Sequence, residues 1–161
     1  MRILTIILTA LILTGCNTPK EVSSKKEGVY TYSLNEKLKP YVFEYLNELE
    51  DNNIKFKNQS FIVMFDLDLI NSPFAGLARG MFNEDLVFVV INPEIFFSMN
   101  EKQRRILIFH ELSHDIFNIR HTASVKLMFP NMIGPTEANE LDFKEEVKLL
   151  MGYIKINRDG K

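Results

Sequence analysis

Residues 98–121 of the chain read SMNEKQRRILIFHELSHDIFNIRH. Between residues 106 and 117, apolar side chains occur on nearly every side of a helix, a pattern that predicts a long buried helix. Ser98 with Glu101 three residues later is the pattern of a capping box, so we expect the helix to begin there. Its end is expected at residue 117 or 118. The rest of the domain should pack around this helix.

Residues 110–114, HELSH, combine the residue types of a metal centre. His110 and His114 are four residues apart and lie on one face of the helix, where both imidazoles can reach one metal ion. Glu111 is rotated from His110 by about 100° around the helix axis, so its carboxylate lies beside the ligands and can take a proton from water. A chance match would bury two unpaired imidazoles, which is costly. The pattern therefore favours a zinc site with Glu111 as its general base.

The residues alone leave the third metal ligand open. The three histidines of the chain lie close together in the sequence, which favours His121. A distal carboxylate, Glu137 or Glu140, could serve instead, or the site could lack a third protein ligand. Asp115, directly after His114, either accepts a hydrogen bond from a ligand imidazole or a neighbouring turn, or lies on the helix surface.

The segment from the first to the last histidine resembles a known family of zinc peptidases. Residues 110–121, HELSHDIFNIRH, resemble the metzincin pattern HExxHxxGxxH, with one residue more before the last histidine. Phe117 stands at the position of the glycine. Asn118, one residue later, is the residue type next best suited to the left-handed conformation that turns the chain back toward the metal. The resemblance implies that His121 is the third ligand.

Three further stretches extend the resemblance. Residues 126–130, KLMFP, resemble the Met-turn of matrixins, which implies that Met128 packs beneath the three imidazoles. Residues 76–80, GLARG, resemble the edge strand above the metzincin cleft. Residues 86–92 resemble the strand that precedes the active-site helix.

The resemblance implies one zinc ion and the hydrolysis of peptide bonds in an extended substrate. The substrate backbone would pair with the edge strand, and a pocket beneath the metal would be closed by the loop after the Met-turn. The candidate substrate contacts are Gly76, Leu77, Ala78, Phe129 and Pro130. With Met132 and Ile133, the last two form an apolar wall that favours a hydrophobic residue just past the scissile bond. Alternatively, these loop residues only pack the core.

Hydrophobic periodicity predicts the remaining elements. The expected strands span residues 61–65, 75–82 and 86–91. A helix within residues 33–51 should begin near Lys39, with Pro40 in its first turn. Asp142 is expected to cap a last helix that ends at about Met151. The predicted fold is α+β: a small zincin (metzincin-like) domain with a short mixed sheet, a central active-site helix, a Met-turn and a C-terminal helix.

The N-terminal residues predict a lipid anchor. In residues 1–15, Arg2 precedes an apolar run that is too short to span a bilayer as a helix but fits a signal peptide. The run ends in Leu-Thr-Gly before Cys16, which resembles the lipobox of bacterial lipoproteins, where the chain is cleaved and the thiol is lipidated. Residues 16–32 are polar and should form a flexible tether, and residues 33–161 should form the catalytic domain.

Composition and charge narrow the partners. A net charge of −2 without a basic stripe argues against a nucleic-acid partner. Acyl chains on Cys16 would hold the protein at the bacterial envelope, on the outer membrane of a Gram-negative cell, where we expect a monomer that acts on peptides or proteins. One alternative is a non-catalytic zinc-binding envelope lipoprotein that uses a peptidase fold for binding; the presence of Glu111 argues against it. Another is a structural or adhesive lipoprotein without a metal.

Overall fold

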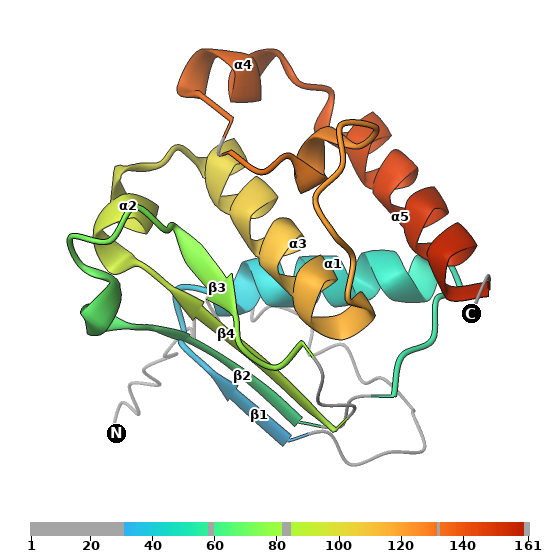
Figure 1. Cartoon of the computed structure of the whole chain (residues 1–161), viewed down its shortest axis with the longest axis horizontal. Helices are drawn as coiled ribbons and strands as arrows, with labels where there is room; N and C mark the ends of the chain where they lie inside the picture. Colours follow the sequence, from blue (N-terminus) through green and yellow to red (C-terminus); the bar gives the residue numbers. More distant parts are fainter. Residues whose placement is uncertain (1–30, 58–59, 82–84, 132, 160–161) are drawn as a thin grey trace, which may run out of the picture.

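The chain folds as one mixed β-sheet with helices packed on it (Figure 1). The computed structural model describes residues 31–57, 60–81, 85–131 and 133–159. The predicted α+β class is confirmed at this coarse level. The expected signal peptide, Cys16 and the tether up to residue 30 lie outside the described residues, as does Met132. A search of the described ranges finds no helix that is long and apolar enough to cross a membrane.

The sheet has four strands in the spatial order β1-β2-β4-β3. They are β1 (Thr31–Leu34), β2 (Ser60–Phe65), β3 (Gly76–Ala78) and β4 (Leu86–Ile91). The first three in this order are parallel, whereas β3 runs antiparallel to β4 and forms an edge of the sheet. Buried Val63 is paired with Leu34 on one side and Val89 on the other. Burial alternates along β2, where Phe61 and Val63 are buried and Met64 is exposed, so this strand buries one face.

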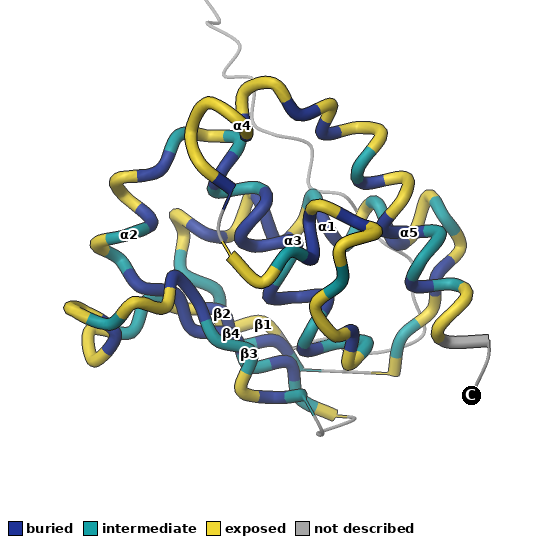
Figure 2. Tube along the Cα trace, turned by 45° about the horizontal axis from the view of Figure 1, so that its top comes forward, coloured by how far each residue is buried: buried dark blue, intermediate teal, exposed yellow. Residues whose placement is uncertain are grey.

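The helices cover one side of the sheet in both Figure 1 and Figure 2. They are α1 (Lys39–Asp51), α2 (Pro93–Ser98), α3 (Glu101–Phe117), α4 (Pro135–Glu140) and α5 (Phe143–Asp159), with the 3-10 turns η1 (Leu67–Leu69) and η2 (Lys126–Met128). Helix α3 lies against β3 and β4 and is contacted by α1, α4 and α5. As predicted, it is the central helix.

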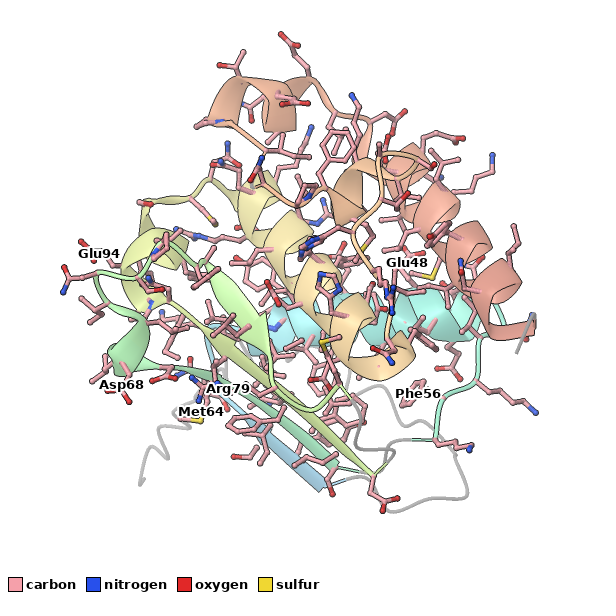
Figure 3. The ribbon with its side chains drawn as sticks, in the orientation of Figure 1. Glu48, Phe56, Met64, Asp68, Arg79 and Glu94 are labelled. Atoms are coloured by element: carbon pink, nitrogen blue, oxygen red, sulfur yellow. The ribbon has the colours of Figure 1, made fainter. Side chains whose placement is uncertain are left out.

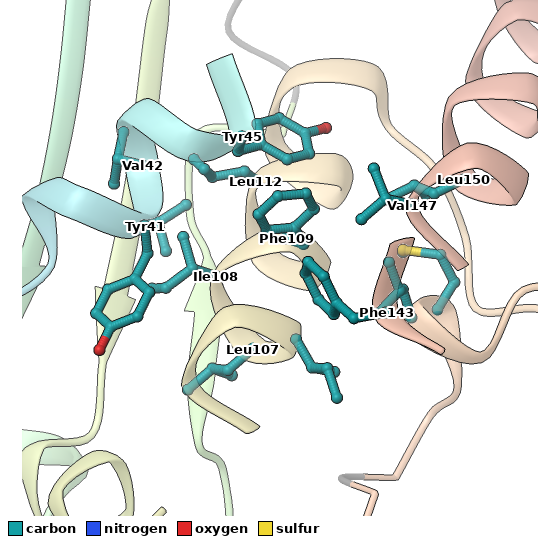
Figure 4. Close-up of a cluster of buried hydrophobic side chains, with 14 of the residues drawn as sticks. Tyr41, Val42, Tyr45, Leu107, Ile108, Phe109, Leu112, Phe143, Val147 and Leu150 are labelled. Carbon is teal, nitrogen blue, oxygen red and sulfur yellow. The ribbon is translucent and has the colours of Figure 1, made fainter. Parts of the chain in front are cut away.

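Aromatic contacts between three helices hold α3 in place (Figure 4). Phe109 of α3 meets the ring of Tyr45 from α1 edge to face at 5.0 Å between centroids, and the ring of Phe143 from α5 at 5.2 Å. All three rings are buried. Such pairs contribute roughly 0.5–1.5 kcal/mol beyond the burial of their area. The helix that carries two of the histidines is thus packed from two sides.

The face of the sheet away from the helices is less buried, with Ile62 and Phe88 half-buried and Met64 exposed. Met64 and Arg79 lie on this face (Figure 3). Arg79 forms an ion pair of 3.0 Å with Asp66, which follows β2. The Arg79 side chain is 45% exposed and that of Asp66 is 16% exposed, so the pair is partly shielded from solvent. The sheet therefore buries its apolar side chains mainly against the helices.

The start of α3 corrects the predicted cap. The N-cap is Asn100, not Ser98: its side chain accepts a hydrogen bond from the backbone N–H of Gln103, and the Gln103 side chain accepts one from the Asn100 N–H. Ser98 instead ends α2, a short helix whose N-cap is Asn92. The Asn-Pro turn after β4 thus opens a helix that the sequence patterns did not predict.

Other boundaries differ from the expectations for physical reasons. Strand β1 includes residues 31 and 32, which were assigned to the tether, and pairs with β2. Strand β3 is shorter than the predicted 75–82, because pairing with β4 ends after residue 79. Helix α5 continues past Met151 to Asp159, since Ile154 extends its buried stripe by another turn. The predicted starts of α1, β2 and β4 are confirmed within one residue.

Candidate metal centre

Three histidine side chains meet at one point above the C-terminal half of α3. The Nε2 atom of His110 lies 3.0 Å from that of His114 and 3.2 Å from that of His121. One ligand atom from each of the three lies within 4.8 Å of the others. His110 and His114 come from α3, as their spacing predicted, and His121 comes from the segment after the helix. The structure therefore brings together all three histidines of the chain.

The turn that returns His121 to the helix is formed by Asn118. This residue has φ 54° and ψ 34°, the left-handed conformation that was predicted for it. Its N–H donates to the His114 carbonyl at 2.9 Å, and the Ile119 N–H donates to the Ser113 carbonyl at 3.4 Å. These two bonds end α3 and reverse the chain. The asparagine thus serves where the resembling pattern has a glycine.

Two backbone carbonyls orient the imidazoles. The Nδ1 atom of His110 lies 2.8 Å from the Leu127 carbonyl oxygen, and that of His114 is hydrogen-bonded to the Ile119 carbonyl oxygen. A carbonyl can only accept, so Nδ1 carries the proton in both rings and the Nε2 lone pairs point to the meeting point. Burial lowers the pKa of His110 to about 4 and lowers that of His114 as well, so both rings are neutral at pH 7.

This donor set fits a zinc ion. Without a cation, two imidazole Nε2 lone pairs at 3.0 Å would repel each other. A tetrahedral zinc ion, with zinc–nitrogen distances of about 2.0–2.1 Å, separates its nitrogen ligands by about 3.3–3.4 Å. The separations of the His110 Nε2 atom from those of His114 and His121 are close to that value. The three histidines can therefore hold a metal ion, and neutral imidazoles suit zinc among several transition metals.

Glu111 lies buried beside the histidines, under strand β3. Burial raises the pKa of its carboxyl to about 7, while a hydrogen bond from the Ala78 backbone lowers it and the nearby Asp115 raises it. A Cβ atom on Gly76 would lie 2.8 Å from the Glu111 Cγ atom, so only glycine fits at that position of the strand. The carboxyl is held between the helix and the edge strand, next to the histidine cluster.

Strand β3 has backbone groups beside this carboxyl that are not paired with β4, although the Ala78 N–H donates to Glu111. The Arg79 N–H donates to the Phe88 carbonyl at 2.7 Å, and the Asn92 N–H donates to the Ala75 carbonyl at 2.9 Å. Because peptide groups alternate along a strand, odd-numbered residues face β4 and those of Gly76 and Ala78 face away. Among the described strands β3 pairs only with β4. Its outer edge is therefore available for hydrogen bonds to another chain.

The segment after His121 forms a tight turn under the site. The Thr122 N–H donates to the Met128 carbonyl at 3.0 Å, which closes the loop, and Met128 is fully buried. The contact that the turn makes with the histidines is the hydrogen bond between the Leu127 carbonyl and His110. Phe129 is half-buried and Pro130 is exposed.

The candidate alternatives to these residues lie elsewhere. Glu137 and Glu140 are exposed on α4, and among the described residues they are not part of the group that could hold a metal.

Ile133 is buried in the core, and its carbonyl accepts a hydrogen bond from the Gln103 side chain at 3.0 Å. For Ile133 the sequence left two possibilities, a wall of the substrate pocket or packing in the core, and the side chain is buried in the core. Leu77 and Ala78 are half-buried on the edge strand.

Asp115 has a role that was not predicted. It is buried, and it accepts hydrogen bonds from the backbone N–H groups of Gly80 at 2.7 Å and Phe88 at 3.4 Å. Neither a ligand imidazole nor the Met-turn is its partner in these bonds. The only signal in the sequence is a shared spacing: Gly80 follows Gly76 by four residues, as Asp115 follows Glu111.

No protein-family model, curated protein or solved structure matches the chain. The interpretation of the site therefore depends on its own geometry.

Proposed function

We propose that the protein is a zinc-dependent endopeptidase of the metzincin type. The observation that carries the proposal is the meeting of three Nε2 atoms beside a buried carboxyl and an open strand edge. In this proposal His110, His114 and His121 hold the zinc ion, and Glu111 is the general base.

Several features of the fold support the resemblance noted in the sequence. An antiparallel edge strand lies over the active-site helix, and the helix ends in a left-handed residue before the third histidine. A buried methionine follows in a tight turn whose backbone contacts the first histidine. In our proposal Met128 forms the apolar floor of the site, as the resemblance implies.

The residues present can perform the required proton transfers. When bound, zinc would supply Lewis-acid activation of water and of a peptide carbonyl. Burial raises the pKa of the Glu111 carboxyl to about 7, a range in which a carboxyl can accept a proton from water and later donate it to the leaving amine. The Nδ1 hydrogen bonds of His110 and His114 keep their Nε2 atoms aimed at the metal.

The open edge of β3 and the loop after Met128 are the proposed substrate contacts. Backbone groups of Gly76 and the Ala78 carbonyl face away from β4, where an extended peptide can pair with them largely independently of its side chains, while the Ala78 N–H stays with Glu111. Half-buried Phe129 and exposed Pro130 would form the wall of a pocket for a hydrophobic residue just past the scissile bond. In this proposal the enzyme is held at the bacterial envelope through Cys16.

The test measures the zinc content of the purified protein and its ability to hydrolyse peptides. Wild type should bind one zinc ion per chain and cleave members of a broad peptide library. Glu111→Gln should keep the zinc and lose activity by about 10² to 10⁴, whereas His121→Ala should bind zinc more weakly. Glu137→Gln, on an exposed helix, is the matched control and should behave as wild type.

The outcomes separate the competing functions. Full activity of Glu111→Gln with normal zinc would overturn the assignment of the base. Loss of zinc binding in Glu137→Gln, with His121→Ala unaffected, would move the third ligand to α4. One zinc ion without turnover of any peptide would overturn the endopeptidase proposal in favour of a zinc-binding lipoprotein. Absence of zinc would overturn the metal site itself.

A further inference from the structure

Two glycines of residues 76–80, here called the edge segment, face two buried carboxyl groups of α3. Gly76 lies against Glu111, and Gly80 lies against Asp115: Cβ atoms there would be 2.8 Å from the Glu111 Cγ and 2.7 Å from the Asp115 Oδ1. Both pairs of residues have a spacing of four. The edge segment therefore approaches the active-site helix at two points, and at Gly80 an added Cβ would also meet the Leu86 carbonyl oxygen of β4 at 2.6 Å.

The second point, at Gly80, is where the backbone pairing between β3 and β4 ends. The Arg79 N–H still donates to the Phe88 carbonyl, but β3 ends before it as a regular strand. The Gly80 N–H and the Phe88 N–H, one from each strand, both point to the Asp115 carboxylate. The Asp115 side chain thus accepts hydrogen bonds from backbone groups that are no longer paired between β3 and β4.

These bonds connect indirectly to the catalytic carboxyl. Asp115 is one turn after Glu111 on α3, and Gly80 is two residues after Ala78 on the edge segment. The Ala78 backbone is a hydrogen-bond partner of the Glu111 carboxyl. A helix turn and a short stretch of strand are both stiff, so fixing one pair of contacts limits the separation at the other.

We propose that Asp115 is a positioning residue, which holds β3 at the distance from α3 that places Ala78 against Glu111. Asp115 does not touch the metal or the substrate in this proposal; it acts through the edge segment. The catalytic part of the proposal rests on the proposed endopeptidase function. The structural part, that the edge segment is held to α3 by this carboxylate, does not.

The variants are Asp115→Ala and Asp115→Asn, with Gly134→Ala as a control. Asp115→Ala removes both acceptor atoms. Asp115→Asn keeps one oxygen for the Gly80 N–H but presents no second acceptor to Phe88. Gly134 has nothing within 4 Å of an added Cβ and lies outside the site. Each is prepared as the full zinc-loaded protein.

Three readouts are measured: amide hydrogen exchange, zinc content, and kcat and KM for a cleaved peptide. In Asp115→Ala we expect exchange at Ala78 and Gly80 to accelerate at least about tenfold, because the edge opens more often. Zinc content should stay at one per chain. The kcat should fall by roughly 10- to 100-fold, as for a misplaced catalytic group, with a smaller change in KM. Asp115→Asn should lie between Asp115→Ala and wild type, and the control should match wild type.

The results distinguish the two levels of the proposal. Unchanged exchange at Ala78 and Gly80 in Asp115→Ala would overturn the positioning role, whatever the activity. Faster exchange with wild-type kcat would overturn its catalytic consequence. An inactive wild type would overturn the proposed function, while the exchange rates would still decide the structural part. If Asp115→Ala does not fold, Asp115→Asn decides: exchange at Phe88 and kcat equal to those of wild type would overturn the proposal.

Discussion

The two halves of helix α3 bury different kinds of residue. In residues 101–109 the buried side chains are apolar except for Gln103, which serves the cap. In residues 110–117 the buried side chains include Glu111, Ser113 and Asp115, beside two histidines that meet a third. Along one continuous helix, the buried side chains thus change within a turn from almost entirely apolar to a set that includes several polar ones.

The polar half is bound to other segments through its side chains. Ser113 is hydrogen-bonded to the Tyr45 hydroxyl at 2.9 Å, Asp115 to the Gly80 backbone, and His110 to the Leu127 carbonyl. No buried side-chain nitrogen or oxygen of the described residues lacks a partner. Buried polar groups rarely improve stability over apolar ones of the same size. This difference agrees with the proposal above, in which the first half holds the helix in the fold and the second half carries the metal site.

The largest expected effect tests the packing half. Phe109→Ala removes a buried ring that contacts Tyr45 and Phe143, so we expect the free energy of unfolding to fall by about 3–5 kcal/mol. Zinc bound per folded chain should not change. Urea denaturation with zinc analysis measures both. Ile156→Ala, at a residue that is 74% exposed on α5, is the control and should change stability by less than about 0.5 kcal/mol. A loss below 1 kcal/mol in Phe109→Ala would remove the distinction between the halves.

The next effect tests the polar half through pH. Burial raises the pKa of Glu111 from 4.5 to about 7, so the folded metal-free protein favours the protonated carboxyl. Its contribution to stability is therefore lost as the pH rises from 4.5 to 7. The lowered pKa values of His110 and His114 act in the opposite direction, since protonation of the unfolded chain reduces stability as the pH falls below 6.5. Wild-type stability should consequently vary little across this window.

Glu111→Gln isolates the carboxyl from the histidines. With a chelator present, its free energy of unfolding relative to wild type should increase as the pH rises from 4.5 to 7, with a slope of at most about 1.4 kcal/mol per pH unit. Urea denaturation at a series of pH values gives this difference directly. Asp115, with its pKa raised to about 6 by burial, is present in both proteins, so most of its own titration cancels in this difference. A difference that does not change with pH would show that Glu111 titrates alike in the folded and unfolded chain.

The sequence predicted the elements whose signals are local. The spacing of His110 and His114 and the suitability of Asn118 for a left-handed turn follow from the helix itself. Strand β4 was predicted at its observed bounds because a run of β-branched residues lies between two turns. Such features need no information about other parts of the chain.

The features that were missed depend on contacts between distant segments. Strand β1 has only four residues and is stabilised by pairing with β2, so it has no clear pattern of its own. Asp115 could not be placed because its partners, Gly80 and Phe88, lie 35 and 27 residues away. The shared spacing of the glycines and carboxyls becomes informative only once β3 is known to lie along α3.

The smallest expected effect concerns the N-cap of α3, at the beginning of the packing half. The sequence predicted Ser98 as this cap, whereas the structure has Asn100. Asn100→Ala removes the acceptor for the Gln103 N–H and should lower the free energy of unfolding by about 1 kcal/mol. Ser98→Ala is the matched control: its hydroxyl bonds only to the Ile95 carbonyl within α2 and is exposed, so we expect less than about 0.5 kcal/mol. Neither variant should alter zinc binding, because the cap lies more than two turns from His110. A larger loss in Ser98→Ala than in Asn100→Ala would restore the predicted capping box at Ser98. A loss of zinc in Asn100→Ala would show that the two halves of α3 are coupled, and the division between packing and chemistry would then not hold.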